Sequence, residues 1–336
     1  MNDISRSPFQ RISEIGMGYI HTKALCAVAR LGIADLIGDD EASGITDLAK
    51  ATDTDEQALY RVMRLLAGLG VFREEAGKVF AHTEMSECLR EQHEQSARHR
   101  LMFWGEEQYE AFEEILHSLR TGKPAFDLRY DAPVFDYLKT HDEVNKRFQS
   151  SMRNSTRSDT GAILDAYDFS GFTRIVDVGG GNGTLLSGIL CTCPEVAALL
   201  FDRANTIELA RTGVGGPLPR CEFVAGDFFD EIPAGGDLYT LKRIIHDWES
   251  EDAVSILRNC RKAMGENAKL LIIEDLVGPP NRHTLANQRD ITMLVIVGGL
   301  ERRQEEYRSL LEQADLKLDR IFNTETDISI LEAHAE

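Results

Sequence analysis

The stretch RIVDVGGGNGTLL, residues 174–186, places four glycines within five positions, directly after a short apolar run. A glycine-rich turn between a strand and a helix lets a ligand lie against main-chain atoms, because glycine has no side chain to keep it away. The N-terminus of the following helix offers free N–H groups to the same ligand. The stretch therefore predicts a strand, a ligand-binding turn and a helix of an α/β fold.

The spacing of these glycines separates two ligand classes. A dinucleotide site has the pattern G-x-G-x-x-G, and its third glycine would fall at Thr184 if Gly179 and Gly181 were the first two. Asp177 lies two residues before the glycines, where its carboxylate would face a pyrophosphate. S-adenosylmethionine (SAM) has no phosphate and carries an ammonium and a sulfonium, so it suits this turn better. A tight turn without a ligand is the alternative from this motif alone.

Composition excludes several classes of protein. With 336 residues, 43% of them apolar, the chain is expected to be globular with roughly two domains. No apolar run approaches the ~20 residues that span a bilayer, and the N-terminus lacks a signal sequence, so we expect a cytoplasmic protein without membrane contact. The six cysteines show no metal-ligand spacing, and the net charge of −19 argues against nucleic acid as a partner.

The first part of the chain is expected to be mainly helical. Residues 8–100 contain apolar positions at helical spacing, with a short helix starting near Ser43 or Thr46, a second starting near Asp53 or Thr54, and a hairpin within 69–83. This order is typical of a winged helix, which serves either DNA recognition or dimerisation. The acidic helix DTDEQALYRVMRLL favours dimerisation, because a recognition helix needs basic contacts.

A homodimer is predicted through an apolar face of the N-terminal helices. The face comprises Ile15, Met17, Ile20, Leu25, Val28 and Leu31. The predicted division is a winged-helix-like dimerisation domain over 1–100, a helical linker that lines the acceptor pocket over 101–165, and a ligand-binding domain over 166–336.

The second half alternates short apolar runs with helical segments. Strands are predicted at 174–179, 198–202, 221–227, 237–245 and 269–275, with helices between them, which implies a parallel sheet covered on both faces. Two further runs, 317–323 and 328–334, are separated by too few residues for a parallel crossover and predict an antiparallel hairpin. The mixed sheet is Rossmann-like but differs from the all-parallel dinucleotide fold.

Acidic residues end the first three predicted strands. Ligands of open α/β sheets lie at the carboxyl ends of the strands. Asp202 could accept hydrogen bonds from both ribose hydroxyls, Asp227 could accept one from the adenine amino group, and Phe228 could pack on the ring. Each acid could also be a helix cap or turn residue, but three in this placement favour a SAM site.

The motifs VDVGGGNG, LLFDR, VAGDFF, LKRIIHDW and GGLERR, in this order, resemble the plant and bacterial small-molecule O-methyltransferases, the family of caffeic acid O-methyltransferase. The likeness covers nearly the whole chain and implies a SAM methyltransferase domain behind a winged-helix-like dimerisation domain. The segments MFWGEEQYEAF and FDLRYDAPVFDYLK further resemble the bacterial branch that methylates phenazines and other polycyclic natural products. The resemblance implies cofactor contacts at Asp177, Gly179, Gly181, Asp202, Asp227, Phe228 and Lys242.

The resemblance also implies His246 as the general base, flanked by Glu274 and Glu301. Histidine suits a phenol because its ordinary pKa lies near working pH, and a carboxylate such as Glu301 could fix the imidazole tautomer. No metal is expected. The apolar side chains predicted to contact a planar aromatic acceptor are Trp104, Phe148, Met152 and Met293.

We therefore predict a SAM-dependent O-methyltransferase acting on a phenolic hydroxyl of an aromatic or polycyclic secondary metabolite. An N-methyltransferase, or a hydroxylase or decarboxylase on the same fold, is the first alternative, and His246 argues against it because a ring nitrogen with a free lone pair needs no base. A winged-helix regulator is the second, and it lacks a basic helix.

Overall fold

The chain divides into two compact units in a computed structural model that describes residues 7–39 and 41–336. Unit 1 contains the described residues up to Glu113 together with Leu138–Asn154, and unit 2 contains Glu114–Tyr137 and Ser155–Glu336. The predicted linker, 101–165, is thus shared between the two units. Within the described ranges, no helix has the length and apolarity needed to cross a membrane.

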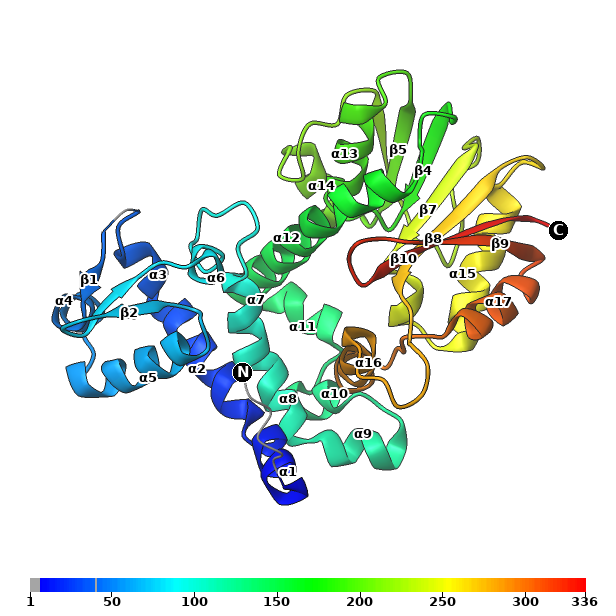
Figure 1. Cartoon of the computed structure of the whole chain (residues 1–336). Coiled ribbons are helices and arrows are strands. Elements are labelled where there is room, and N and C mark those ends of the chain that lie inside the picture. Colours follow the sequence, from blue (N-terminus) through cyan, green and yellow to red (C-terminus); the bar gives the residue numbers. More distant parts are fainter. Residues whose placement is uncertain (1–6, 40) are drawn as a thin grey trace. The chain divides into compact units, whose positions relative to one another are not determined.

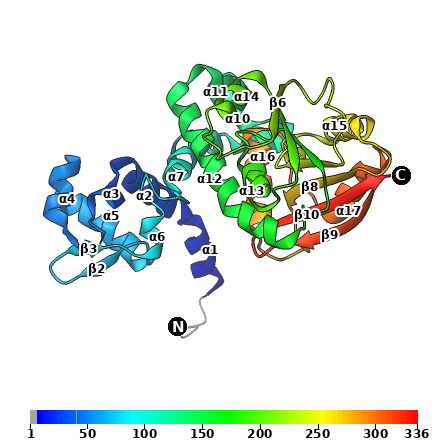
Figure 2. The same cartoon turned by 90° about the horizontal axis from the view of Figure 1, so that it is seen from above.

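Unit 1 is built from helices and a small sheet with strand order β1-β3-β2. The pair α4 (Ile45–Thr52) and α5 (Glu56–Gly68) is followed by the antiparallel hairpin of β2 (Arg73–Glu75) and β3 (Val79–Ala81), as predicted, and Figure 2 shows the hairpin beside α5. The other elements are α1 (Pro8–Gly16), α2 (Gly18–Leu31), α3 (Ile33–Leu36), β1 (Ser43–Gly44), α6 (Glu84–Glu87), α7 (Arg98–Phe103), the π-helical η1 (Trp104–Gln108) and α8 (Tyr109–Glu113), together with the end of α11 (Val134–Thr140) and the first half of α12 (Asp142–Ala166).

The predicted helix starts in unit 1 were wrong by one or two residues. Gly44 precedes α4 without a side-chain cap, and Asp55 caps α5 by accepting a hydrogen bond from the backbone N–H of Ala58. Asp53 cannot begin α5 because it ends α4 in a left-handed conformation, with φ of 52°.

The predicted apolar face of the N-terminal helices is partly exposed and partly buried in the structure. Ile15, Met17 and Ile20 are exposed, whereas Val28 is buried in the core of unit 1, with Leu25 and Leu31 packed against that core. The inner side of α2 therefore stabilises its own unit, and the exposed apolar side chains gather on α1 and the start of α2.

Unit 2 is organised around a seven-stranded sheet of order β6-β5-β4-β7-β8-β10-β9 (Figure 1). The neighbouring pairs from β6 to β8 are parallel, and β10 is antiparallel to both β8 and β9, so the predicted mixed sheet and C-terminal hairpin are confirmed. The strands are β4 (Arg174–Val178), β5 (Ala197–Asp202), β6 (Cys221–Ala225), β7 (Leu238–Lys242), β8 (Lys269–Asp275), β9 (Leu316–Asn323) and β10 (Ile328–Ala335).

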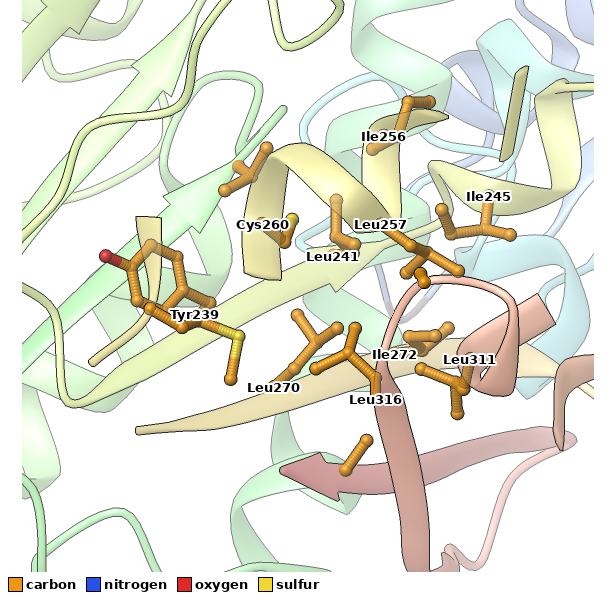
Figure 3. Close-up of a cluster of buried hydrophobic side chains, with 14 of the residues drawn as sticks. Tyr239, Leu241, Ile245, Ile256, Leu257, Cys260, Leu270, Ile272, Leu311 and Leu316 are labelled. Atoms are coloured by element: carbon orange, nitrogen blue, oxygen red, sulfur yellow. The ribbon is translucent and has the colours of Figure 1, made fainter. Parts of the chain in front are cut away.

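Helices cover both faces of this sheet. On one face, α15 (Ser250–Ala263) and α17 (Gln304–Glu312) pack with Leu241, Leu270 and Ile272, and Ile245 belongs to the same core cluster (Figure 3). On the other face lie α13 (Thr184–Thr192), α14 (Ala204–Arg211) and the end of α12 (Asp142–Ala166). The remaining elements are α9 (Ile115–Thr121), α10 (Ala125–Tyr130), α11 (Val134–Thr140), η2 (Ile245–Asp247) and α16 (Leu285–Ile296).

Candidate active site

The turn between β4 and α13 consists mainly of glycine because neighbouring side chains leave no room for a Cβ atom at most of its positions. A Cβ atom on Gly179 would lie 2.4 Å from the Ile244 side chain, and one on Gly180 would lie 2.4 Å from both an Asp177 carboxylate oxygen and Leu200. Gly181 differs, since a Cβ there would meet nothing within 4 Å. Gly181 also has a φ of +61°, which L-residues rarely adopt. Open space at the turn is therefore found at Gly181.

Asp177, one residue before the end of β4, and Asp202, the last residue of β5, lie on neighbouring strands beside this turn. Asp177 is buried and accepts a hydrogen bond from the Thr240 hydroxyl at 2.6 Å, and burial raises its pKa to about 6. Asp202 accepts hydrogen bonds from the backbone N–H groups of Gly181 at 2.8 Å and Arg203 at 2.7 Å, one on each oxygen. A carboxylate oxygen can accept a second hydrogen bond, so Asp202 retains capacity for a hydroxyl-bearing ligand.

The next predicted contacts follow β6. Asp227 is exposed and accepts a hydrogen bond from the backbone N–H of Phe229 at 2.9 Å. Phe228 is partly buried, with its ring 5.9 Å from that of Trp248 between centroids, and it lies 3.7 Å from the Cβ position of Gly179. Phe228 therefore lies beside the glycine turn, where an aromatic ring could stack.

Lys242 ends β7 and is already paired within unit 2. Its Nζ atom lies 3.2 Å from an Asp159 carboxylate oxygen and 3.3 Å from the Thr156 hydroxyl. Burial and the neighbouring Arg243 lower the pKa of Lys242 to about 8, against the opposing effect of Asp159. Arg243 also contacts Asp159, at 3.3 Å, and Asp275, at 3.2 Å.

His246 lies on η2, directly after the buried core residue Ile245. Its Nδ1 atom is 2.8 Å from Glu301 Oε1 and 3.5 Å from Glu274 Oε2, and its Nε2 atom is 3.4 Å from Asp247 Oδ1. The structure thus brings together the three residues predicted to be catalytic. The Glu301 contact is a hydrogen bond in which Nδ1–H donates to the carboxylate, so in the neutral form of the imidazole the lone pair is on Nε2.

The three carboxylates around His246 control its protonation. Burial by itself would lower the pKa of the imidazole, but the negative charges of Glu274, Asp247 and Glu301 outweigh it and raise the pKa to about 9. Burial, partly offset by His246, raises the pKa of Glu274 to about 7. The cluster therefore favours imidazolium, the form that a base acquires after accepting a proton.

Candidate ligand atoms of His246, Glu274 and Glu301 lie within 4.8 Å of one another, a spacing that could also hold a metal ion. One oxygen of Glu274 accepts hydrogen bonds from three backbone N–H groups, and one oxygen of Glu301 accepts from His246. The expected absence of a metal stays a prediction.

The side chains predicted to contact an acceptor lie in both units. In unit 1, Trp104 and Met152 are exposed, and the ring of Phe148 packs edge-on against Phe103 with 5.5 Å between centroids. Met293 is partly buried on α16 of unit 2. Their contact with an acceptor stays a prediction.

Sequence reasoning missed three side chains that support the site: Asp159, Arg243 and Arg302. Asp159 lies on a polar stretch of α12 with no motif around it, so no local signal marks it. Arg302 is next to Glu301 in GGLERR, and its burial, with 1% of its surface exposed, is the unusual feature that only the structure reveals.

Comparisons with known proteins agree with this geometry. The O-methyltransferase domain family matches residues 112–317, and the O-methyltransferase dimerisation domain matches residues 14–92. Phenazine O-methyltransferase PhzM of Lysobacter antibioticus is 38% identical over 321 residues, which cover 94% of this chain and 93% of the relative. Phenazine-1-carboxylate N-methyltransferase of Pseudomonas aeruginosa is 30% identical and covers 96% of each chain.

A solved structure with ligands also matches. The O-methyltransferase NcsB1 from neocarzinostatin biosynthesis, in complex with SAM and 2-hydroxy-5-methyl naphthoic acid, has a TM-score of 0.78 and 30% identity, and covers 94% of this chain and 96% of that chain. The open space at Gly181 and the spare acceptor capacity of Asp202 fit SAM. The chain is a SAM-dependent enzyme and belongs to the O-methyltransferase family.

Proposed function

We propose that this methyltransferase acts on a phenolic hydroxyl of an aromatic or polycyclic secondary metabolite, with His246 as general base. The observation that carries the proposal is the buried hydrogen bond from His246 Nδ1 to Glu301, which fixes the tautomer whose Nε2 can take a proton. The relatives support the acceptor class, since they include enzymes named for phenazine, aminohydroxybenzoate and naphthoate substrates.

The residues of the chain bind and orient the reactants and handle one proton. In the proposed reaction His246 Nε2 accepts the hydroxyl proton while the acceptor oxygen takes the methyl group, with the sulfonium–methyl bond breaking to leave S-adenosylhomocysteine, a neutral thioether. Glu301 stabilises the resulting imidazolium through the 2.8 Å hydrogen bond. When bound, SAM supplies an electrophilic methyl group on a sulfonium. Asp202, Asp227, Phe228 and Lys242 are the proposed contacts to it, together with Asp177, Gly179 and Gly181.

Replacing His246 with Gln tests the base. Gln keeps a polar side chain but has no nitrogen that titrates, so SAM affinity should change little, whereas turnover of a phenol should fall by about 10² to 10⁴ at neutral pH. Raising the pH should restore part of the rate, because more acceptor arrives ionised. Full turnover by His246→Gln at neutral pH would exclude a base role.

His334→Gln is the matched control for this test. His334 also pairs with a carboxylate, at 2.6 Å from Asp319 Oδ2, but it lies on the last strand and outside the site. Turnover should be unchanged in this variant, so that a loss in His246→Gln reports on the site and not on histidine removal in general.

N-methylation is the second candidate, because one relative at 30% identity is named a phenazine-1-carboxylate N-methyltransferase. An amine nitrogen with a free lone pair needs no base, so a buried histidine held by a carboxylate favours the oxygen acceptor. Mass spectrometry of products from matched hydroxy- and amino-substituted aromatics would distinguish the two. A methyl gain on the amines alone would exclude O-methylation.

We further propose a homodimer formed through the N-terminal unit, with the winged-helix-like elements as its scaffold. The dimerisation-domain match supports it, as does the exposure of 78% for Phe9, 68% for Ile12 and 80% for Ile15. Ile12→Asp should yield a monomer in sedimentation velocity, and Met85→Asp, an equally polar change at an exposed site on α6, should remain dimeric. A dimer that survives Ile12→Asp would count against this face.

A further inference from the structure

The turn that carries His246 is too short to be stable alone. The helix η2 spans three residues, Ile245–Asp247, and a single 3₁₀ turn fixes several backbone angles for few hydrogen bonds. Ile245 anchors one side of it in the core cluster (Figure 3). The position of His246 therefore depends on what binds the free backbone groups of the turn.

Glu274 binds the N–H groups at the start of this turn. Its Oε1 atom accepts hydrogen bonds from Ile244 at 3.1 Å, Ile245 at 3.0 Å and His246 at 3.3 Å. A carboxylate is favourable at this end because free N–H groups give a helix start partial positive charge. Glu274 is thus tied to the backbone of the turn as well as lying near the imidazole.

Arg302 binds the carbonyl groups at the opposite end. Its guanidinium donates through Nη1 to the Ile245 carbonyl at 2.9 Å and through Nη2 to the Trp248 carbonyl at 2.7 Å. A buried guanidinium is unfavourable unless its donors are used, and two of the Arg302 nitrogens are used on this turn. Negative charge at the start and positive charge at the end match the polarity of a helix.

The backbone around Arg302 is fixed as well. Arg302 forms a parallel β-bridge with Leu276, and its carbonyl accepts from the Val277 N–H at 3.0 Å. The Leu300 N–H donates to the His246 carbonyl at 2.8 Å, and a Cβ on Gly299 would lie 2.0 Å from that carbonyl oxygen. The segment 299–302 therefore lies against the turn at a distance that only glycine permits.

We propose that Arg302 is a positioning residue for methyl transfer, which holds the His246 turn in register with Glu301. Glu301 orients the imidazole ring, and the adjacent Arg302 orients the backbone from which the ring extends, so one short segment sets both. This inference rests on the proposed role of His246. The experiments are therefore chosen so that they can contradict the role of Arg302 without contradicting the role of His246.

The first readout needs no substrate. In Arg302→Met the side chain keeps its approximate length but loses its donors, so the turn should move away from Glu301. NMR titration of the His246 ring in the full chain should then give a pKa below that of the wild type, because the Glu301 contact is weakened while Glu274 and Asp247 remain. Loss of the guanidinium charge by itself would raise this pKa, so a fall reports on the weakened contact. An unchanged titration would overturn the proposal.

The second readout is turnover of 1-hydroxyphenazine below and above the pKa of its own hydroxyl. A small misplacement of a catalytic group can reduce the rate by about 10², so Arg302→Met should lose roughly that factor on the neutral acceptor, lose less on the ionised one, and keep its affinity for SAM. Equal losses on both forms would mean a general structural role and would overturn the inference.

The double variant His246→Gln/Arg302→Met keeps the two proposals apart. If both residues act through one base, the double variant should be no slower than His246→Gln alone. If His246→Gln has full turnover, the proposed base role fails, and the ring titration of Arg302→Met still decides whether Arg302 positions the His246 ring.

Two more variants serve as a fallback and as a control for this test. Arg302→Lys keeps the charge, but its single ammonium cannot bind both carbonyls as the two guanidinium nitrogens do. It should therefore show a smaller change in the His246 pKa and a smaller loss of turnover than Arg302→Met. It also remains usable if Arg302→Met does not fold. Arg220→Met is the matched control, because Arg220 also donates to two backbone carbonyls, of Val196 and Leu190, away from His246. It should leave the His246 titration and the turnover unchanged, and a shift as large as that in Arg302→Met would overturn the proposal.

Discussion

Glu301→Gln removes the negative charge that accepts the hydrogen bond from His246 Nδ1 while keeping the shape of the side chain. The bond is 2.8 Å long and both groups are buried. A hydrogen bond to a charged group contributes roughly 1.5–3 kcal/mol, which corresponds to about one to two pKa units. We therefore expect the pKa of His246 to fall from about 9 to between about 7 and 8.

The assay is the pH dependence of kcat/KM, because this ratio reports the ionisation of the free enzyme. The imidazole must be neutral to accept a proton, so the rate of the wild type should rise with pH towards a midpoint near 9. In Glu301→Gln this midpoint should move down by about one to two units. The plateau should fall by roughly tenfold to a hundredfold, because the imidazolium formed during transfer loses the same stabilisation.

Stability gives an independent check with a definite sign. Because the folded-state pKa of His246 is raised from 6.5 to about 9, its bound proton stabilises the fold fully below pH 6.5, and this stabilisation is lost as the pH rises through 9. Glu301→Gln should flatten the pH dependence of the unfolding free energy in that window.

Glu332→Gln is the matched control, since Glu332 is another buried glutamate, which lies on β10 and accepts a hydrogen bond from the Tyr167 hydroxyl at 2.5 Å. Its profile midpoint should stay where the wild type has it. If the midpoint is also unchanged in Glu301→Gln, then Glu301 does not govern the protonation of His246 and the reasoning from this hydrogen bond is wrong.

Two other changes test the glycine turn as part of the proposed SAM site. Asp202→Ala should weaken SAM binding by roughly tenfold to a hundredfold in calorimetry, because ribose hydroxyls would lose a charged acceptor, and equal affinity would remove Asp202 from the site. Gly180→Ala should lower the melting temperature more than Gly181→Ala, because its Cβ would overlap Asp177 and Leu200, while the Gly181 variant mainly meets a backbone penalty of about 1–2 kcal/mol. Gly181→Ala should also reduce SAM affinity, and the opposite ranking in either measurement would contradict the packing argument.

Most of the fold of unit 2 was predictable because its signals are local. The apolar run before the glycines became β4, and the runs before Asp202 and Asp275 became β5 and β8. The short gap between β9 and β10 excluded a parallel crossover, and the two strands do pair antiparallel. Strand order could not be obtained this way, since the insertion of β10 between β8 and β9 is decided by packing over the whole sheet.

The predicted helix starts show a limit within a single turn. Ser43, Thr46, Asp53 and Thr54 all have side chains that can cap a helix, so composition allows each of them. The structure uses Asp55 for α5, because the chain leaves α4 through a left-handed Asp53 and only then becomes extended. Residue type gives the candidates, and backbone geometry selects among them.

The residues that hold the candidate site in place were less predictable than its central residues. His246 and Glu301 belong to motifs that can be read locally, although 55 positions separate them. Asp159 lies more than 80 positions before its partners Lys242 and Arg243, on a helix with no distinguishing pattern. A buried charge is visible in a sequence only as a charged residue, which is most often exposed, so its partners must come from the structure.

Packing and backbone conformation both explain the glycines of the turn after β4. Side chains at Gly179 and Gly180 would overlap Ile244, Asp177 and Leu200, whereas Gly181 faces open space. Gly179 and Gly181 also both have a positive φ, +68° and +61°, which L-residues rarely adopt. Ile244 is also one of the residues whose N–H binds Glu274 in the His246 turn. The close packing at Gly179 therefore joins the glycine turn to the His246 turn, and we expect a larger residue at Gly179 to displace both.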